Sequence, residues 1–96
     1  MYSFFFLGRS IIKKSGKKEQ DMLDASKIGI VIQTIREEKG LSQEVVRGLA
    51  GIGRTHLSAI ERGQRKPTLE TFFRLAEALD MPPPKLMKHI HIEEAL

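Results

Sequence analysis

The pattern of apolar and polar positions predicts helices along most of this chain. The first begins at Ser26 as N-cap and ends at Lys39, before Gly40, and Ile28, Ile32 and Ile35 line its inward face at i, i+4 and i+7. Only the start of the chain, which is rich in aromatic residues, has the bias of a strand. The fold class expected is therefore all-α, a compact bundle of about five short helices.

Two further apolar residues of the first helix, Ile30 and Val31, fall outside its inward stripe. A wider core face would explain them. Alternatively, they form a surface that residues 4–7 or a second subunit cover, because exposed apolar patches usually meet a partner.

Two more helices are predicted in the last third of the chain. Thr68 caps a helix that runs to Leu79, and the run Pro82-Pro83-Pro84 stops helix formation, although Pro84 can itself open a last helix, residues 85–95, as its first residue. The side chains expected to turn inward are Leu69, Phe72, Leu75, Ala76 and Leu79 in the first of these helices, and Leu86, Met87 and Ile90 in the second.

Residues 42–63 contain two shorter helical patterns with a break at Gly51-Ile52-Gly53. Ser42 is a good N-cap for the first, and Gly63 stands where a left-handed residue would close the second. The apolar positions at helical spacing are Val46, Leu49 and Ala50, followed by Leu57 and Ile60. Two helices of about eight residues joined by a glycine-containing turn are typical of the DNA-binding helix-turn-helix.

The residues in and around this motif carry a resemblance to a known family. They are Gly29-Ile30-Val31-Ile32 to Glu37-Glu38-Lys39-Gly40, Leu41-Ser42-Gln43-Glu44, Gly51-Ile52, Leu57-Ser58-Ala59-Ile60-Glu61-Arg62-Gly63, Arg65-Lys66-Pro67-Thr68-Leu69-Glu70-Thr71 and Arg74-Leu75-Ala76-Glu77-Ala78-Leu79. In this order they resemble the phage-repressor-like (XRE-type, lambda-repressor-like) helix-turn-helix family, over roughly residues 27–87.

The resemblance implies that the helix at 54–62 lies in the major groove of DNA. Leu57 and Ile60 would then point into the core, and Arg54 could pair with the O6 and N7 atoms of a guanine. The base-facing set carried over is Arg54, Thr55, His56, Ser58 and Ala59. A solvated or phosphate-contacting side chain stays open as the alternative for Arg54, and a purely structural role stays open for His56.

Contacts to phosphates are expected on either side of that helix. Gln43, at the start of the first helix of the motif, carries over as a phosphate contact from the family. Arg62, Arg65 and Lys66 follow the recognition helix and would add affinity without sequence information. Glu61 does not suit a surface beside DNA and is interpreted as structural, paired with an arginine.

Arg47 departs from the family, which usually has a small residue at this place where the two helices cross. An unpaired buried arginine is costly. Either its aliphatic stem lies along the helix with its charge in solvent or on a phosphate, or the helices cross at a different angle.

Charge is concentrated in two places in a chain of net charge +4. Residues 1–21 hold five cations and two acids, and residues 54–66 hold four cations and one acid, which suits a polyanionic partner. Cysteine is absent, which excludes disulfides and thiolate metal sites and favours a cytoplasmic location.

Residues 1–21 lie outside the family pattern and form an irregular N-terminal arm, ahead of a domain at 22–96. The apolar run Phe4-Phe5-Phe6-Leu7 precedes the cations, unlike a signal peptide, and is too short to span a bilayer. A membrane-surface anchor, a flexible or partner-packed arm, and a natural start at Met22 all remain open, with the partner-packed or flexible arm preferred over the anchor.

No catalytic constellation, cofactor motif or metal site is expected. The pair His89 and His91 lies at i and i+2, on different sides of a helix. We therefore expect a protein that is not an enzyme: a sequence-specific regulator of transcription, a repressor, that binds a pseudo-palindromic double-stranded DNA operator as a homodimer. The alternative is a protein-interaction module of the same fold, such as an antitoxin or anti-repressor partner, that uses residues 4–7 with Ile30 and Val31.

Overall fold

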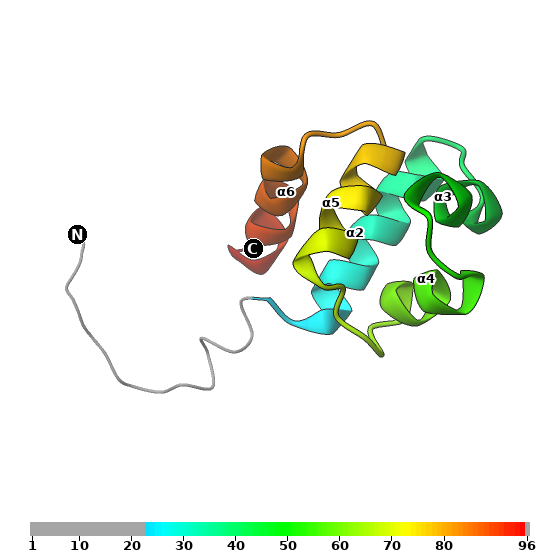
Figure 1. Ribbon diagram of the computed structural model, residues 1–96. Coiled ribbons are helices and arrows are strands. Elements are labelled where there is room, and N and C mark those ends of the chain that lie inside the picture. Colours follow the sequence, from blue (N-terminus) through cyan, green and yellow to red (C-terminus); the bar gives the residue numbers. More distant parts are fainter. Residues whose placement is uncertain (1–22, 96) are drawn as a thin grey trace.

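The computed structural model describes residues 23–95, which form five helices and no strand within that range (Figure 1). The helices are α2 (Ala25–Glu38), α3 (Gln43–Ala50), α4 (Arg54–Glu61), α5 (Leu69–Ala78) and α6 (Pro83–Ala95). The predicted all-α bundle is confirmed. The arm predicted at 1–21, and with it the domain boundary before Met22, lies outside the described residues.

The helices divide into a central pair and two flanking groups. In Figure 1, α2 and α5 occupy the middle, α6 lies at one end, and α3 and α4 lie at the other. Helix α6 packs against α2 and α5, α3 packs against α5 and α4, and α4 packs against α2. The helix-turn-helix therefore sits on one end of the bundle rather than inside it.

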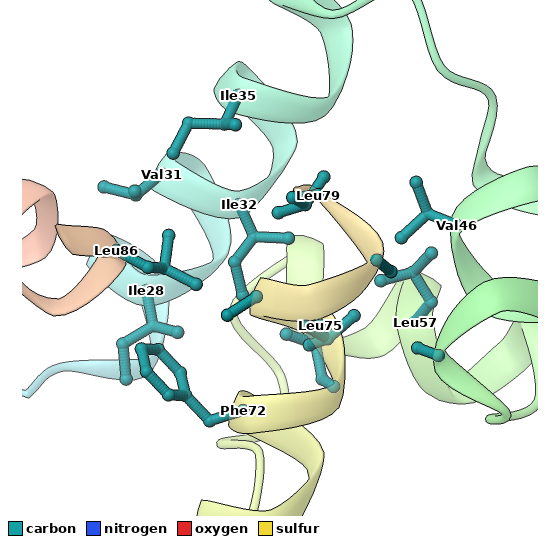
Figure 2. Close-up of a cluster of buried hydrophobic side chains, with 14 of the residues drawn as sticks. Ile28, Val31, Ile32, Ile35, Val46, Leu57, Phe72, Leu75, Leu79 and Leu86 are labelled. Atoms are coloured by element: carbon teal, nitrogen blue, oxygen red, sulfur yellow. The ribbon is translucent and has the colours of Figure 1, made fainter. Parts of the chain in front are cut away.

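The core is built from the apolar stripes that the sequence predicts. Figure 2 shows Ile32 at the centre of the cluster, with Leu86 on one side and Leu75 and Leu79 on the other. Ile28 and Ile35 are buried as well. Inward residues from five helices thus meet in one cluster, which holds α3 and α4 to the rest.

Two helix starts differ from the prediction. The N-cap of α2 is Asp24 instead of Ser26: its extended backbone precedes the helix, and its Oδ2 accepts a hydrogen bond of 3.0 Å from the backbone N–H of Ser26. A carboxylate is well placed at this end of the helix dipole. Helix α6 begins at Pro83, one residue before Pro84, because the carbonyl of Pro82 already accepts from the N–H groups of the first turn.

The two extra apolar residues of α2, Ile30 and Val31, differ in their burial. Val31 is buried and lies beside Leu86 of α6 in Figure 2, so the wider core face is correct for this residue. Ile30 is 55% exposed.

Three predicted inward positions are wrong or only partly right. Leu49 and Leu69 are 66% and 70% exposed, and Met87 is 37% exposed, whereas Leu86 and Ile90 are buried as predicted. Leu69 is the first residue of α5, and Leu49 is on the outer side of α3 with Val45. Within residues 23–95, no helix combines the length and the apolar character that crossing a membrane requires.

Candidate nucleic-acid interface

Helices α3 and α4 form the predicted helix-turn-helix. The Oγ of Ser42 accepts a hydrogen bond of 3.1 Å from the N–H of Val45, so Ser42 caps α3 as expected. Gly51 ends α3 with φ 72°, a left-handed conformation that glycine adopts without strain. Ile52 then packs against the core, and Gly53 precedes α4. The turn is thereby fixed by backbone geometry and one apolar side chain.

Helix α4 has a buried side and an exposed side. Leu57 and Ile60 are fully buried, as predicted, whereas Arg54 and Thr55 in the first turn are exposed. His56, Ser58 and Ala59 are half-buried. The predicted base-facing set therefore lies outside the core, with its most exposed members at the N-terminal end of the helix.

Arg62 forms a small network at the C-terminal end of α4. Its Nη1 donates to the Oγ of Ser58 at 2.8 Å, and its Nη2 donates to the Oε1 of Gln64 at 3.0 Å. The structure ends α4 at Glu61, so Arg62 is its C-cap rather than its last residue. These bonds hold the guanidinium beside Ser58, which brings a predicted phosphate contact and a predicted base contact together.

The predicted cations after α4 are all on the surface. Arg62, Arg65 and Lys66 are exposed, and Arg65 and Lys66 lie in the loop between α4 and α5. Arg54 stands at the opposite end of α4, about 12 Å away along the axis of an eight-residue helix. The positive charges thus flank the exposed face of α4 at both ends.

Glu61 is the acid that pairs with an arginine, and that arginine is Arg36 of α2. The Nε of Arg36 donates to the Oε2 of Glu61 at 2.7 Å, and its Nη2 donates to Oε1 at 3.1 Å. The two side chains are 10% and 2% exposed. The hydrogen bond to Glu61 raises the pKa of Arg36, and this effect outweighs burial, which lowers it. The predicted structural role of Glu61 is therefore confirmed.

The pair has three further partners, one of which is Glu37, whose Oε2 lies 3.7 Å from the Nη2 of Arg36. The Nη1 of Arg36 donates to the carbonyl oxygen of Leu41 at 2.8 Å, and the Nε2 of Gln43 donates to Oε1 of Glu61 at 2.9 Å. This network joins α2, the start of α3 and the end of α4. Sequence reasoning did not identify Arg36, although its position four residues after Ile32 places it on the inward stripe of α2.

The side chain of Gln43 therefore has a structural role in addition to its predicted phosphate contact. One amide hydrogen of its side chain bonds Glu61, which orients the amide at the start of α3. An amide nitrogen carries two hydrogens, so a second donor remains for a phosphate. The predicted phosphate contact of Gln43 stays a prediction.

Arg47 is accommodated without being buried. Its side chain is 37% exposed, and its Nη2 lies 2.6 Å from the Oε2 of Glu44 on the same helix. The hydrogen bond to Arg47 lowers the pKa of Glu44, and the charges of Arg47 and, less strongly, Arg54 act in the same direction. Of the two readings of this departure, the one in which the charge reaches solvent agrees with the structure.

Within the described residues, His89 and His91 of α6 do not belong to a group of metal ligands. Nδ1 of His89 lies 2.9 Å from the carbonyl oxygen of Lys85, and His91 is exposed. Over the described part of the chain, no group of three or more His, Cys, Asp or Glu residues is arranged to hold a metal ion.

Comparison with known proteins agrees with this fold and motif. The sequence model of a family described as helix-turn-helix matches residues 32–86, more than half of the chain. The helix-turn-helix-type transcriptional regulator y4dJ of Sinorhizobium fredii, itself uncharacterised, is 44% identical over 52 residues, which are 54% of this chain and 68% of that protein.

Two solved structures extend the comparison to three dimensions. The restriction-modification controller protein C.AhdI of Aeromonas hydrophila is 41% identical, with a TM-score of 0.63 over 66% of this chain and 96% of that one. The controller protein C.Esp1396I, solved as a tetramer with its natural 35-base-pair operator, is 29% identical, with a TM-score of 0.70 over 75% of this chain and 95% of that one. The chain belongs to the phage-repressor-like (XRE-type) helix-turn-helix family, whose members are DNA-binding transcriptional regulators and not enzymes.

Proposed function

We propose that this protein is a sequence-specific repressor that places α4 in the major groove of its operator. The observation that carries the proposal is the division of α4: Leu57, Ile60 and Glu61 hold it to the core, while Arg54 and Thr55 project from its first turn. An anchored helix with an exposed N-terminal end suits the reading of base edges, because bases are recognised by side chains in fixed positions.

Each exposed residue of α4 has a chemistry suited to a base edge. Arg54 can donate two hydrogen bonds to a guanine, which discriminates against other bases by about 1–3 kcal/mol. Thr55 can hydrogen-bond or place its methyl group against a thymine methyl. The remaining base-facing positions are His56, Ser58 and Ala59, which are half-buried.

The phosphate contacts surround this reading surface. Arg62, Arg65 and Lys66 lie beyond one end of α4, and Gln43 lies at the start of α3. Cations that neutralise phosphates release counterions, so they supply affinity that falls steeply as salt rises. The protein would act where the DNA is, in the cytoplasm.

The protein acts, in this proposal, as a homodimer on a pseudo-palindromic operator. The exposed side chains of Leu23, Leu69 and Met87 border a hollow of about 180 Å³ whose floor includes Phe72 and Ile90. Lys66 also lines this hollow, so a second copy seated there would lie beside the loop that follows α4. Two recognition helices would then read half-sites about 10 base pairs apart.

Selection of bound duplexes from a random pool tests the proposal. Enrichment of a two-fold symmetric site, bound less tightly as salt rises, is the result expected for a dimer that contacts phosphates. No enrichment even at low salt would contradict the proposal.

That negative result would favour the second candidate, a protein-interaction module. Its support in the structure is Ile30, which remains 55% exposed on α2, and its binding would change little with salt. The arm at 4–7, which this candidate also uses, lies outside the described residues.

A further inference from the structure

The backbones of α2 and of the last turn of α4 pack closely because residue 29 of α2 is a glycine. Gly29 is buried in α2, and a Cβ atom added there would lie 2.3 Å from the carbonyl oxygen of Ile60 and 2.6 Å from that of Glu61. Carbon–oxygen contacts between helices are ordinarily about 3.3–3.6 Å. Any side chain at this position would therefore force the two backbones apart by roughly 1 Å.

Gly48, which also lies inside a described helix, provides a contrast. Gly48 of α3 has open space around it, and a Cβ atom there would meet nothing within 4 Å. Since glycine is less favourable than alanine inside a helix, the helix itself gains nothing from glycine at either site. The advantage of glycine at position 29 is that it lets α4 pack close to α2.

A second glycine, Gly63, allows a close contact at the same end of α4. Gly63, just after the helix, has φ 76°, and a Cβ atom there would lie 2.9 Å from the Cα of Ser26. Together with the bond between Arg36 and Glu61, these contacts fix the C-terminal end of α4 on α2 through backbone and one buried ion pair. At the opposite end, a Cβ atom added at Gly53, which precedes Arg54, would meet nothing within 4 Å.

Helix α4 is the element that gives way if the contact is widened. Helix α2 has 14 residues and four buried apolar side chains, whereas α4 has eight residues and two, Leu57 and Ile60. The main contacts of α4 are with α2 and α3. A shift of roughly 1 Å where α4 rests on α2 would tilt or lift its exposed end, where base contacts tolerate little displacement.

We propose that Gly29 is a positioning residue for DNA recognition. It touches no DNA and sets how α4 is presented to the major groove, so it controls the preference for the operator over other DNA. Long, flexible arginine and lysine side chains follow phosphates despite such a shift, so non-specific affinity is spared. The inference rests on the proposed function of α4.

The test compares Gly29→Ala with two controls in the full chain. Gly48→Ala is the same substitution at an open helical site, and Ile90→Val lowers stability in α6, which packs on α2 and α5. Fluorescence anisotropy gives the affinity of each for the selected duplex and for a scrambled one, urea unfolding gives stability, and amide residual dipolar couplings give the orientation of α4 relative to α2.

For Gly29→Ala we expect operator affinity to fall by about tenfold or more, scrambled-duplex affinity to stay within about twofold, and the orientation of α4 to change. Both controls should keep the parent's ratio of the two affinities. An unchanged ratio in Gly29→Ala, or an equal loss on both duplexes, would overturn the positioning role while leaving the proposed function standing.

Two further outcomes are decisive. If Gly29→Ala does not fold, it is repeated in the Gly48→Ala background, which should be more stable; failure to fold there would show that Gly29 serves the fold alone and would overturn the inference. If the parent itself shows no preference for any duplex, the proposed function and this inference both fail.

Discussion

Two arginine–glutamate pairs in this protein have nearly the same closest distance and very different surroundings. Arg36 and Glu61 meet at 2.7 Å between α2 and α4, with side chains 10% and 2% exposed. Arg47 and Glu44 meet at 2.6 Å on the outer face of α3, with side chains 37% and 57% exposed. The first pair joins residues 25 apart in sequence, and the second joins residues three apart.

The difference teaches that surroundings, and not distance, decide what an ion pair does here. The buried pair has extra partners in Leu41 and Gln43 and closes the junction on which α4 rests. Removing Glu61 would leave the buried guanidinium of Arg36 with only the more distant carboxylate of Glu37, 3.7 Å away, whereas solvent replaces either member of the exposed pair. The buried pair therefore helps to position α4 on α2, whereas the exposed pair links two residues of α3 only.

The largest effect is expected for Glu61→Ala. It removes both hydrogen bonds from Arg36 to Glu61 and leaves Glu37, 3.7 Å away, as the counterion of Arg36, so it should lower the free energy of unfolding by about 3 kcal/mol in urea titrations. The matched change on the surface is Glu44→Ala, which should leave the unfolding midpoint almost unchanged. Equal effects of the two substitutions would show that burial does not distinguish the pairs.

A double variant sharpens this result. Arg36→Met with Glu61→Met removes both charges and should recover most of the stability lost in Glu61→Ala, because apolar residues of similar size often replace a buried pair at little cost. Operator affinity should not recover in parallel, since the hydrogen bonds that orient Gln43 and the end of α4 are gone. Full recovery of binding would mean that the network serves stability only.

A smaller effect is expected for Gln43→Ala, which removes one hydrogen bond from the buried pair and leaves both charges matched. The free energy of unfolding should fall by about 1 kcal/mol. Gln33→Ala is the control, because Gln33 makes a similar bond of 3.2 Å to Glu37 on the exposed side of α2. If Gln43 also binds a phosphate as proposed, its loss should weaken selected and scrambled duplexes alike.

The smallest effect concerns the exposed pair. The pKa of Glu44 is lowered from 4.5, chiefly by its hydrogen bond to Arg47, so Arg47→Ala should let it rise toward that value in an NMR titration of the carboxyl carbon. A lowered folded pKa means that the pair's slight stabilisation is present above pH 4.5 and is lost as the pH falls through the folded value. A titration curve unchanged by the substitution would contradict the pairing.

The sequence predicted those features of the fold that depend on residues close together in the chain. Helical spacing of Ile28 and Ile32 identified the inward face of α2, and the left-handed helix end predicted at Gly63 is confirmed with φ 76°. The break predicted at Gly51 is confirmed as the end of α3. Boundaries were less accurate at α2 and α6, where Asp24 and Pro83 compete with neighbouring residues that are also good at starting helices.

Features that depend on contacts across the chain were not predictable. Periodicity assigned Leu49 and Leu69 to the core because it cannot show where the neighbouring helices end, and both are exposed. The role of Arg36 depends on Glu61, 25 residues later, and the role of Gly29 depends on carbonyl groups of α4. The base and phosphate contacts themselves stay predictions, carried by the family and by the exposure of α4.

The central claim, that the first turn of α4 reads bases, is tested most directly by Arg54→Ala on the selected operator and on duplexes with each base pair changed singly. The control is Arg65→Ala, in the loop after α4. We predict that Arg54→Ala loses about 1–3 kcal/mol on the parent operator and loses discrimination at one base pair of each half-site, whereas Arg65→Ala weakens all duplexes uniformly and reduces the salt dependence. Full discrimination at every position in Arg54→Ala would contradict the assignment of that turn to base reading.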